Sequence, residues 1–159
     1  MSREETLAFF DTYRDAFNRL DGDAVADLWC AASGIADSHG PEGSARLTWW
    51  PEEAPMRANH RALCVLYGRA DCDRADFELQ QHQALGAHHA FAHVHWTLRR
   101  TDGSLLQQFH TGYQLMRTAS GPRVLLAVAH EENLAWMHPQ SIQNANPKSK
   151  PETERHAAE

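Results

Sequence analysis

The chain has 159 residues, of which 42% are hydrophobic and 23% are charged, so it is long enough for one domain with a real core and too short for two ordinary ones. The formal net charge is -6 and Arg99-Arg100 is the only basic doublet, which argues against a nucleic-acid partner. No apolar run approaches the roughly 20 residues of a membrane span, and the N-terminus has no apolar signal segment, so we expect a cytoplasmic protein without membrane contact.

The N-terminal residues predict one long helix. Ser2-x-x-Glu5 is a capping box, and apolar side chains recur after it at helical spacing, which predicts a helix over about residues 3–20. Tyr13 lies on the apolar face of that helix, so we expect its side chain to be buried.

Two short elements and another long helix follow. Asp23 is placed to cap a short helix that runs to Trp29, and "SGIADSHG" reads as an edge strand that ends at Asp37. We interpret "LTWWP", with Trp49 and Trp50, as loop packing, and an apolar lid over a pocket is the open alternative. Pro55 suits the first turn of a third helix. The inward stripe of this helix consists of Met56, His60, Leu63 and Tyr67.

From residue 75 onward the apolar period is two, which predicts an antiparallel meander of four strands. Turn signals at residues 86–87, 102–103 and 120–122 separate the strands. If the first two turns have two residues each, the inward face carries three rows of side chains. These rows are Phe77, Trp96 and Phe109, then Leu79, Val94 and Thr111, then Gln81, Ala92 and Tyr113.

The opposite face of the meander is polar and aromatic but carries few charges. Its members are Glu78, Gln80, His82, His93, His95, Thr97, Gln108 and His110. The His-x-His spacing suggests a metal site, but the paired carboxylate is missing, so we expect no metal. We predict instead a homodimer that forms through this outer face. The residues expected at that interface are His82, Phe91, His93, His95, His110 and Met116.

The remaining features define the limits of the domain. Beyond Trp136 the chain is punctuated by proline and poor in large apolar residues, so we predict a domain over residues 1–136 and a polar, flexible tail over residues 137–159. The three cysteines are odd in number and lack CxxC spacing, which predicts reduced thiols.

This order of elements resembles the nuclear transport factor 2-like superfamily, also called cystatin-like. "YRDAFNRLDGDAVADLW" resembles the opening of that superfamily, and "GPRVLLAVAHEEN" resembles its last strand. The resemblance implies an α+β fold, in which a cone-like, curved antiparallel sheet wraps around the long N-terminal helix and leaves a pocket at its open end.

Within the superfamily, the opening stretch resembles the SnoaL-like and ketosteroid isomerase-like pattern. There a helix tyrosine donates to a developing oxyanion and a strand-end aspartate moves the proton, and these positions correspond to Tyr13 and Asp37. The isomerases place another acid on the penultimate strand, where this chain has Thr111, Tyr113 and Gln114. We expect Tyr113 to act as the substitute donor.

Each candidate residue also has a purely structural interpretation. Tyr13 is alternatively a core aromatic, and Asp37 alternatively caps the turn that follows it. His60 is alternatively a core histidine. His130 faces inward only if it pairs with Thr111, because a slip of one residue turns it outward.

Together these residues predict a protein with a pocket for a small apolar molecule and without a cofactor. One interpretation is an isomerase, dehydratase, cyclase or hydrolase that works by general acid/base chemistry. Its catalytic residues are Asp37, Tyr13, Tyr113 and His130. The alternative is a non-catalytic module that binds a ligand or another protein. The expected pocket lining is Phe17, Trp29, His60, Phe77, Leu79, Trp96, Phe109 and Thr111.

Overall fold

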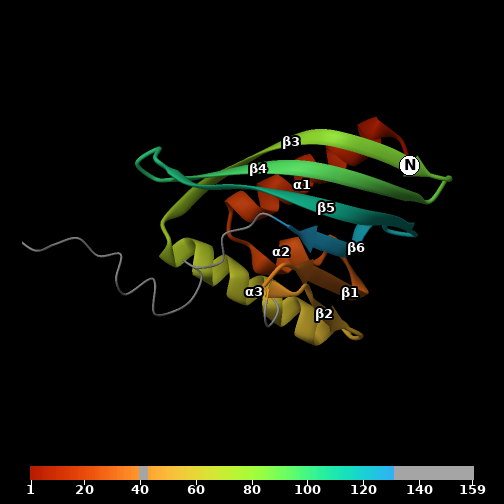
Figure 1. The fold of residues 1–159 in the computed structure, drawn as a ribbon, viewed down its shortest axis with the longest axis horizontal. Helices are drawn as coiled ribbons and strands as arrows, with labels where there is room; N and C mark the ends of the chain where they lie inside the picture. Colours follow the sequence, from red (N-terminus) through yellow and green to blue (C-terminus); the bar gives the residue numbers. More distant parts are fainter. Residues whose placement is uncertain (40–42, 131–159) are drawn as a thin grey trace, which may run out of the picture.

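The structure, a computed structural model, describes residues 1–39 and 43–130, and this part of the chain forms three helices and one curved sheet of six strands. Figure 1 shows helix α1 lying across one face of the sheet, with α2 and α3 below it. The predicted α+β architecture is therefore confirmed. The predicted tail, residues 137–159, lies outside the described residues.

The first two helices begin at side-chain caps. Helix α1 (Arg3–Asn18) has the expected capping box, because Ser2 Oγ accepts from the backbone N–H of Glu5 and the Glu5 carboxylate accepts from the backbone N–H of Ser2. Helix α2 (Gly22–Ala26) is capped by Asp21, whose carboxylate accepts from the N–H of Ala24 at 3.0 Å. Our assignment of Asp23 as this cap was wrong.

The sheet has the strand order β2-β1-β6-β5-β4-β3. Strands β1 and β6 are parallel and every other neighbouring pair is antiparallel. The strands are β1 (Trp29–Asp37), β2 (Arg46–Trp50), β3 (Cys72–Leu85), β4 (His89–Arg100), β5 (Leu105–Thr118) and β6 (Gly121–Ala129), and helix α3 (Glu53–Arg69) connects β2 to β3.

Strand β2 corrects the interpretation of "LTWWP" as loop packing. Residues 46–50 pair with β1 in an antiparallel register that places Thr48 opposite Ile35. The second helix also ends earlier than expected, because Trp29 already belongs to β1.

The predicted register of the meander is correct for its first two rows. Phe77 pairs with Trp96 and Trp96 with Phe109, and the same alignment joins Val94 to Thr111. A bulge between Leu79 and Gln81 then shifts β3 by one residue.

The bulge changes two assignments made from the sequence. Gln81 lies opposite His93 instead of Ala92, and His82 takes the place opposite Ala92. Because the side-chain period of a strand is two, His82 leaves the outer face to which we had assigned it.

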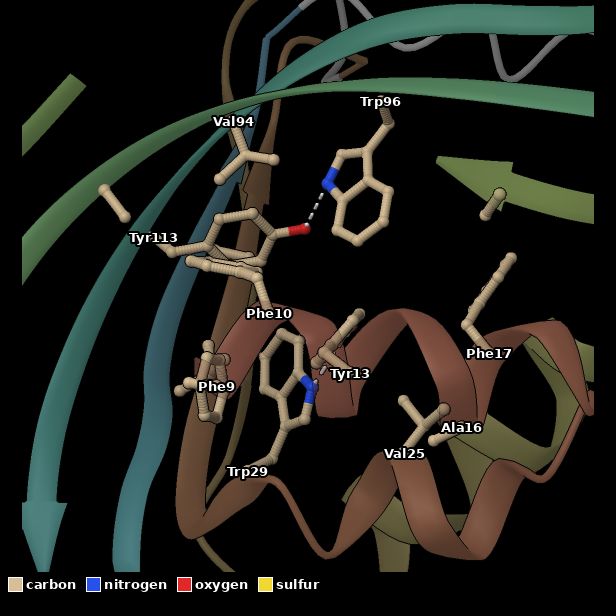
Figure 2. Packing of buried hydrophobic residues seen from close by; sticks show 14 of the residues in the cluster. Phe9, Phe10, Tyr13, Ala16, Phe17, Val25, Trp29, Val94, Trp96 and Tyr113 are labelled. Carbon is tan, nitrogen blue, oxygen red and sulfur yellow. Dashed lines mark hydrogen bonds between the residues drawn. The ribbon is translucent and has the colours of Figure 1, made fainter. Parts of the chain in front are cut away.

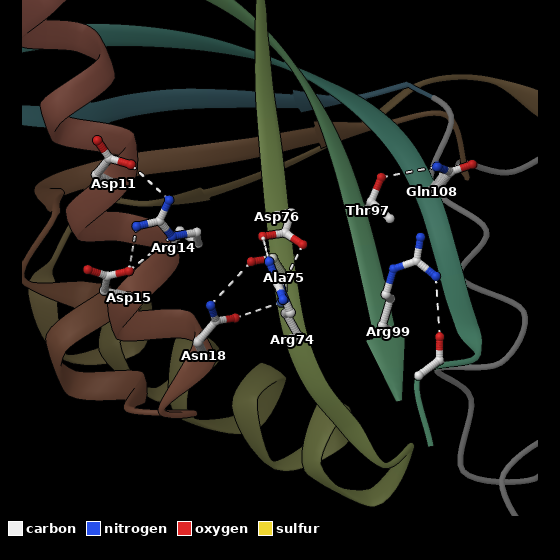
Figure 3. A network of polar contacts seen from close by, with 11 residues as sticks. Asp11, Arg14, Asp15, Asn18, Arg74, Ala75, Asp76, Thr97, Arg99 and Gln108 are labelled. Atoms are coloured by element: carbon white, nitrogen blue, oxygen red, sulfur yellow. Dashed lines mark hydrogen bonds and ion pairs between the residues drawn. The ribbon is translucent and has the colours of Figure 1, made fainter. Parts of the chain in front are cut away.

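The end of α1 is attached to the sheet through Asn18. The Asn18 side chain accepts from the N–H of Ala75 at 2.6 Å and donates to the carbonyl of Ala75 at 3.2 Å. Figure 3 shows this pair of hydrogen bonds beside the exposed ion pairs of Arg14. Asn18 thereby satisfies backbone groups of β3, an edge strand, and holds the helix against it.

Buried aromatic side chains fill the space between α1 and the sheet. Phe10 is fully buried and its ring lies 5.1 Å from the ring of Tyr113, centroid to centroid. Figure 2 shows this cluster, in which side chains of α1, β1, β4 and β5 meet.

Among the described residues, no helix is long and apolar enough to cross a membrane.

Candidate functional site

A cavity of about 80 Å³ lies between α1, α3 and the inner face of the sheet. Eight of the residues that we expected around a pocket line it: Tyr13, Phe17, Trp29, His60, Trp96, Phe109, Thr111 and Tyr113. Sequence reasoning missed Ile35, Leu63, Tyr67, Leu98, Ala127 and Ala129, although the inward stripe of the third helix already contained Leu63 and Tyr67.

Two residues that we expected in the lining, Phe77 and Leu79, lie outside it. Both are partly buried and pack against the hydrophobic core instead. They belong to β3, and the ring of Phe77 lies 5.8 Å from the ring of Phe10, centroid to centroid. This end of the inward row therefore packs against α1 and does not contribute to the cavity lining.

Two tryptophans hold the two tyrosines of the cavity in place. The indole Nε1–H of Trp96 donates to Tyr113 Oη at 3.0 Å, and that of Trp29 donates to Tyr13 Oη at 3.4 Å (Figure 2). The rings of Tyr13 and Tyr113 lie 6.2 Å apart, centroid to centroid. In both bonds the phenol oxygen is the acceptor, so each indole fixes the position of one tyrosine hydroxyl group in the cavity.

His60 is the buried titratable base of the cavity. Its side chain is 1% exposed, and its ring lies 4.5 Å from the ring of Trp29, centroid to centroid. Neither ring nitrogen has a hydrogen-bond partner among the described residues. Burial, assisted by the positive charge of Arg57, lowers the pKa of His60 to about 4, so the imidazole is neutral at pH 7.

Asp37 ends β1 as predicted, but it does not line the cavity. Its carboxylate accepts from Arg46 Nη2 at 2.7 Å and from the backbone N–H of His39 at 2.9 Å. The turn-capping interpretation of Asp37 is therefore confirmed. The expectation that Asp37 and Tyr13 line one cavity is wrong.

The ionisation of Asp37 also differs from that of a poised base. Burial alone would raise the pKa of Asp37, but the hydrogen bonds from Arg46 and His39 and the charge of Arg46 outweigh it and hold the pKa below its usual range. The catalytic role of Asp37 stays a prediction, and before Asp37 accepts a proton it must give up part of this ion pair. The sequence did not reveal Arg46 as the partner of Asp37, because that pairing depends on β2, which was interpreted as a loop.

His130 lies on the outer face of the sheet, so its expected place in the pocket is wrong. Thr118 pairs with Gly121 across a tight turn, and a bulge after Gln114 then brings Thr111 opposite Ala129. His130 is one residue further along and turns outward. Its Nε2 lies 3.0 Å from Nε2 of His93.

The outward turn of His130 completes a cluster of four histidines on the outer face. The ring centroids of neighbouring members, His93, His95, His110 and His130, lie 4.7 to 5.9 Å apart. In the part of the chain that the structure describes, no group of three or more His, Cys, Asp or Glu side chains is placed to hold a metal ion.

The two indole–phenol hydrogen bonds predict unequal effects of removing each hydroxyl. Tyr113→Phe leaves the buried N–H of Trp96 without its 3.0 Å acceptor, which should lower the free energy of unfolding by about 1–3 kcal/mol. Tyr13→Phe removes a longer, weaker bond and should cost about 1 kcal/mol or less. Urea unfolding measures both values. A larger loss for Tyr13→Phe than for Tyr113→Phe would contradict the assigned hydrogen bonds.

The ion pair of Asp37 predicts how its titration responds to mutation. Because its pKa is lowered in the folded state, Asp37 stabilises the fold above its unfolded pKa of about 4, and this stabilisation is lost as the pH falls further. Arg46→Leu should raise the pKa of Asp37 and reduce that loss. Carbon-13 NMR of the carboxyl group measures the shift. Arg99→Leu, which removes an arginine bonded to the carbonyl of Gly103, is the control and should leave Asp37 unchanged.

Comparison with known proteins agrees with this architecture. No curated protein matches the chain. An NTF2-like protein of unknown function from Shewanella oneidensis MR-1 is similar with a TM-score of 0.63, at 13% identity over 82% of this chain and 100% of the other. A ketosteroid isomerase-like protein from Erwinia carotovora atroseptica SCRI1043 is similar with a TM-score of 0.57, at 16% identity over 84% of this chain and 99% of the other.

A third similar structure carries a different name. It is a putative calcium/calmodulin-dependent protein kinase type II association domain from Thiobacillus denitrificans ATCC 25259, with a TM-score of 0.60 at 20% identity over 79% of this chain and 94% of the other. At these identities the three structures establish the fold alone. A family model described as "NTF2-like protein (DUF6841)" matches residues 4–132, and the chain therefore belongs to this NTF2-like family.

Proposed function

We propose that this protein binds a small, mostly apolar molecule in the cavity between α1, α3 and the sheet. The observation that carries the proposal is His60, whose two ring nitrogens have no hydrogen-bond partner in residues 1–39 and 43–130, while the ring lines an aromatic cavity. A buried polar atom without a hydrogen bond costs about 1–3 kcal/mol, and a ligand that bonds to it recovers part of that cost. Apolar walls with few polar groups are typical of small-molecule sites.

The tryptophans of the chain provide reporters for this proposal. Trp29 and Trp96 donate their indole N–H groups to tyrosines inside the cavity, whereas Trp49 lies on β2 and is 47% exposed. A bound ligand should therefore shift the indole N–H resonances of Trp29 and Trp96 in a nitrogen-15 NMR spectrum and leave that of Trp49 in place.

The experiment screens a library of small neutral ring compounds against the protein and against Ala127→Leu, which fills part of the cavity. Ala127 is 4% exposed and lines the cavity, so the larger side chain should weaken any ligand bound there. Native mass spectrometry of the freshly purified protein searches in parallel for a retained molecule. If no compound shifts the two cavity tryptophans and no retained molecule appears, the pocket proposal is wrong.

A catalytic version of the proposal is the second candidate. It is supported by Tyr13 and Tyr113, which line the same cavity and carry phenol hydroxyl groups of the kind that stabilises an oxyanion developing on a substrate. His60 is then the candidate base among the residues that line the cavity, whereas the carboxylate of Asp37 belongs to the ion pair with Arg46. This version keeps the predicted isomerase, dehydratase, cyclase or hydrolase chemistry and needs no cofactor.

We also propose a homodimer through the outer face of the sheet. Two adjacent rows of side chains cross five strands on this face, and no Asp, Glu, Lys or Arg belongs to either row. The rows are Leu47, Ala36, Val128, Gly112 and His93, and Trp49, Gly34, Leu126, Gln114 and Phe91. An uncharged surface of this extent is typical of an interface. The name of the Thiobacillus association domain also favours assembly.

Glycine makes this outer face flat enough for another sheet. A Cβ on Gly34 would lie 2.7 Å from Trp49 Cε3, and one on Gly112 would lie 3.1 Å from Phe91 Cε2. The two rings therefore rest on the backbone of the neighbouring strands instead of projecting from it. Leu47 is 61% exposed and Val128 39%, so these side chains remain uncovered in a single copy.

A charge placed in these rows should separate the two copies. We predict that the protein sediments as a dimer at micromolar concentration and that Trp49→Glu sediments as a monomer, because the carboxylate cannot be buried without a partner. Val65→Glu is the matched control, since Val65 is 53% exposed on α3, away from the sheet. Analytical ultracentrifugation measures the oligomeric state of all three proteins. A wild-type protein that is monomeric at this concentration would overturn the dimer proposal.

A further inference from the structure

We propose that the ligand of the cavity is a compact, uncharged alcohol whose hydroxyl group bonds to His60. This inference rests on the pocket proposal above and names the chemical class of its ligand. It is carried by three properties of the cavity that the described residues form: a lining without charged side chains, the two nitrogens of His60 without a hydrogen-bond partner, and a small volume.

The lining favours an uncharged molecule. The described residues around the cavity include no Asp, Glu, Lys or Arg, and the polar side chains among them are His60, Thr111 and tyrosine and tryptophan groups. An ion that enters such a cavity loses its hydration without gaining an opposite charge. Carboxylates and ammonium groups are therefore excluded.

The ring of His60 favours a hydroxyl group. A neutral imidazole has one nitrogen that donates and one that accepts, and both are without a partner among the described residues. A hydroxyl group donates to one of these nitrogens or accepts from the other, so it fits whichever tautomer the ring adopts. A carbonyl oxygen accepts only, and it is restricted to the tautomer whose N–H faces the ligand.

The remaining surface and the size of the cavity limit the rest of the molecule. The apolar part of the lining consists of side chains such as Ile35, Leu63, Leu98 and Phe109. The volume of about 80 Å³ favours a compact molecule. One five-membered ring with one polar substituent is the appropriate probe.

The test compares five probes that differ only in the substituent on a cyclopentane ring. Cyclopentanol, cyclopentanone, cyclopentane, cyclopentylammonium and cyclopentanecarboxylate are titrated into the wild-type protein at pH 7, and the indole N–H of Trp29 reports binding because its ring lies against His60. Cyclopentanol should bind most tightly, about tenfold or more above cyclopentane, since one hydrogen bond to a buried group is gained. The two ions should not bind.

Two variants locate the discriminating group. In His60→Phe the ring keeps its approximate size but loses both nitrogens, so cyclopentanol should lose its roughly tenfold advantage while cyclopentane binds as before. His110→Phe changes a histidine of the outer face and should leave the whole series unchanged. The wild-type series alone keeps the test decisive if His60→Phe does not fold.

The outcomes separate this inference from the pocket proposal. If cyclopentane or cyclopentanone binds as tightly as cyclopentanol, the pocket stands and the alcohol assignment is wrong. Preferential binding of either ion also overturns the assignment. If none of the five probes shifts Trp29, the assignment fails for ligands of this size, and the compound library described above decides separately whether the pocket proposal fails as well.

Discussion

The packing of Phe10 between α1 and the inner face of the sheet is the contact on which the rest of the molecule depends. Its ring is fully buried and lies 5.8 Å from Phe77 on β3, 6.4 Å from Trp96 on β4 and 5.1 Å from Tyr113 on β5, centroid to centroid. One side chain thus joins the helix to three strands. Burial of a phenylalanine contributes about 1.5–3 kcal/mol, and ring contacts of this geometry add to it.

The same contact positions the cavity. Trp96 and Tyr113, which pack on Phe10, are also joined by the indole–phenol hydrogen bond that orients the tyrosine hydroxyl. The aromatic core and the candidate site therefore share Trp96 and Tyr113, which belong both to the core cluster and to the cavity lining. Charges are kept away from it: Arg46 neutralises Asp37 at the end of β1, and Arg57 pairs with Asp23, Asp27 and Glu53.

The sequence predicted those parts of the fold that depend on local periodicity. The row of Phe77, Trp96 and Phe109 followed from alternation and turn length, because both are local properties of the chain. The bulge after Leu79 left no comparable signal, and it moved His82 to the other face. The outward turn of His130 has the same kind of cause, since a bulge between neighbouring strands shifts the register after it.

The sequence predicted most of the residues that line the cavity, but it did not predict their ionisation and hydrogen bonding. Helical and strand periodicity placed Tyr13, His60 and Tyr113 on inward faces, and all three line the cavity. The ion pair of Asp37 with Arg46 depends on a strand pairing that the sequence did not reveal. Whether His60 finds a hydrogen-bond partner depends on every side chain around it, which only the assembled fold defines.

A neutral, buried His60 is the central feature of the proposed site, and the pKa of its ring is the most direct quantity to measure. The pKa is measured by nitrogen-15 NMR of the imidazole ring during a titration from pH 8 downward. The signals of His60 are assigned because they are missing from the spectrum of His60→Phe. We predict a midpoint at about 4 and a neutral imidazole at pH 7. A midpoint near the ordinary value of 6.5 would mean that water reaches the ring and that His60 is not the buried, neutral base of the cavity.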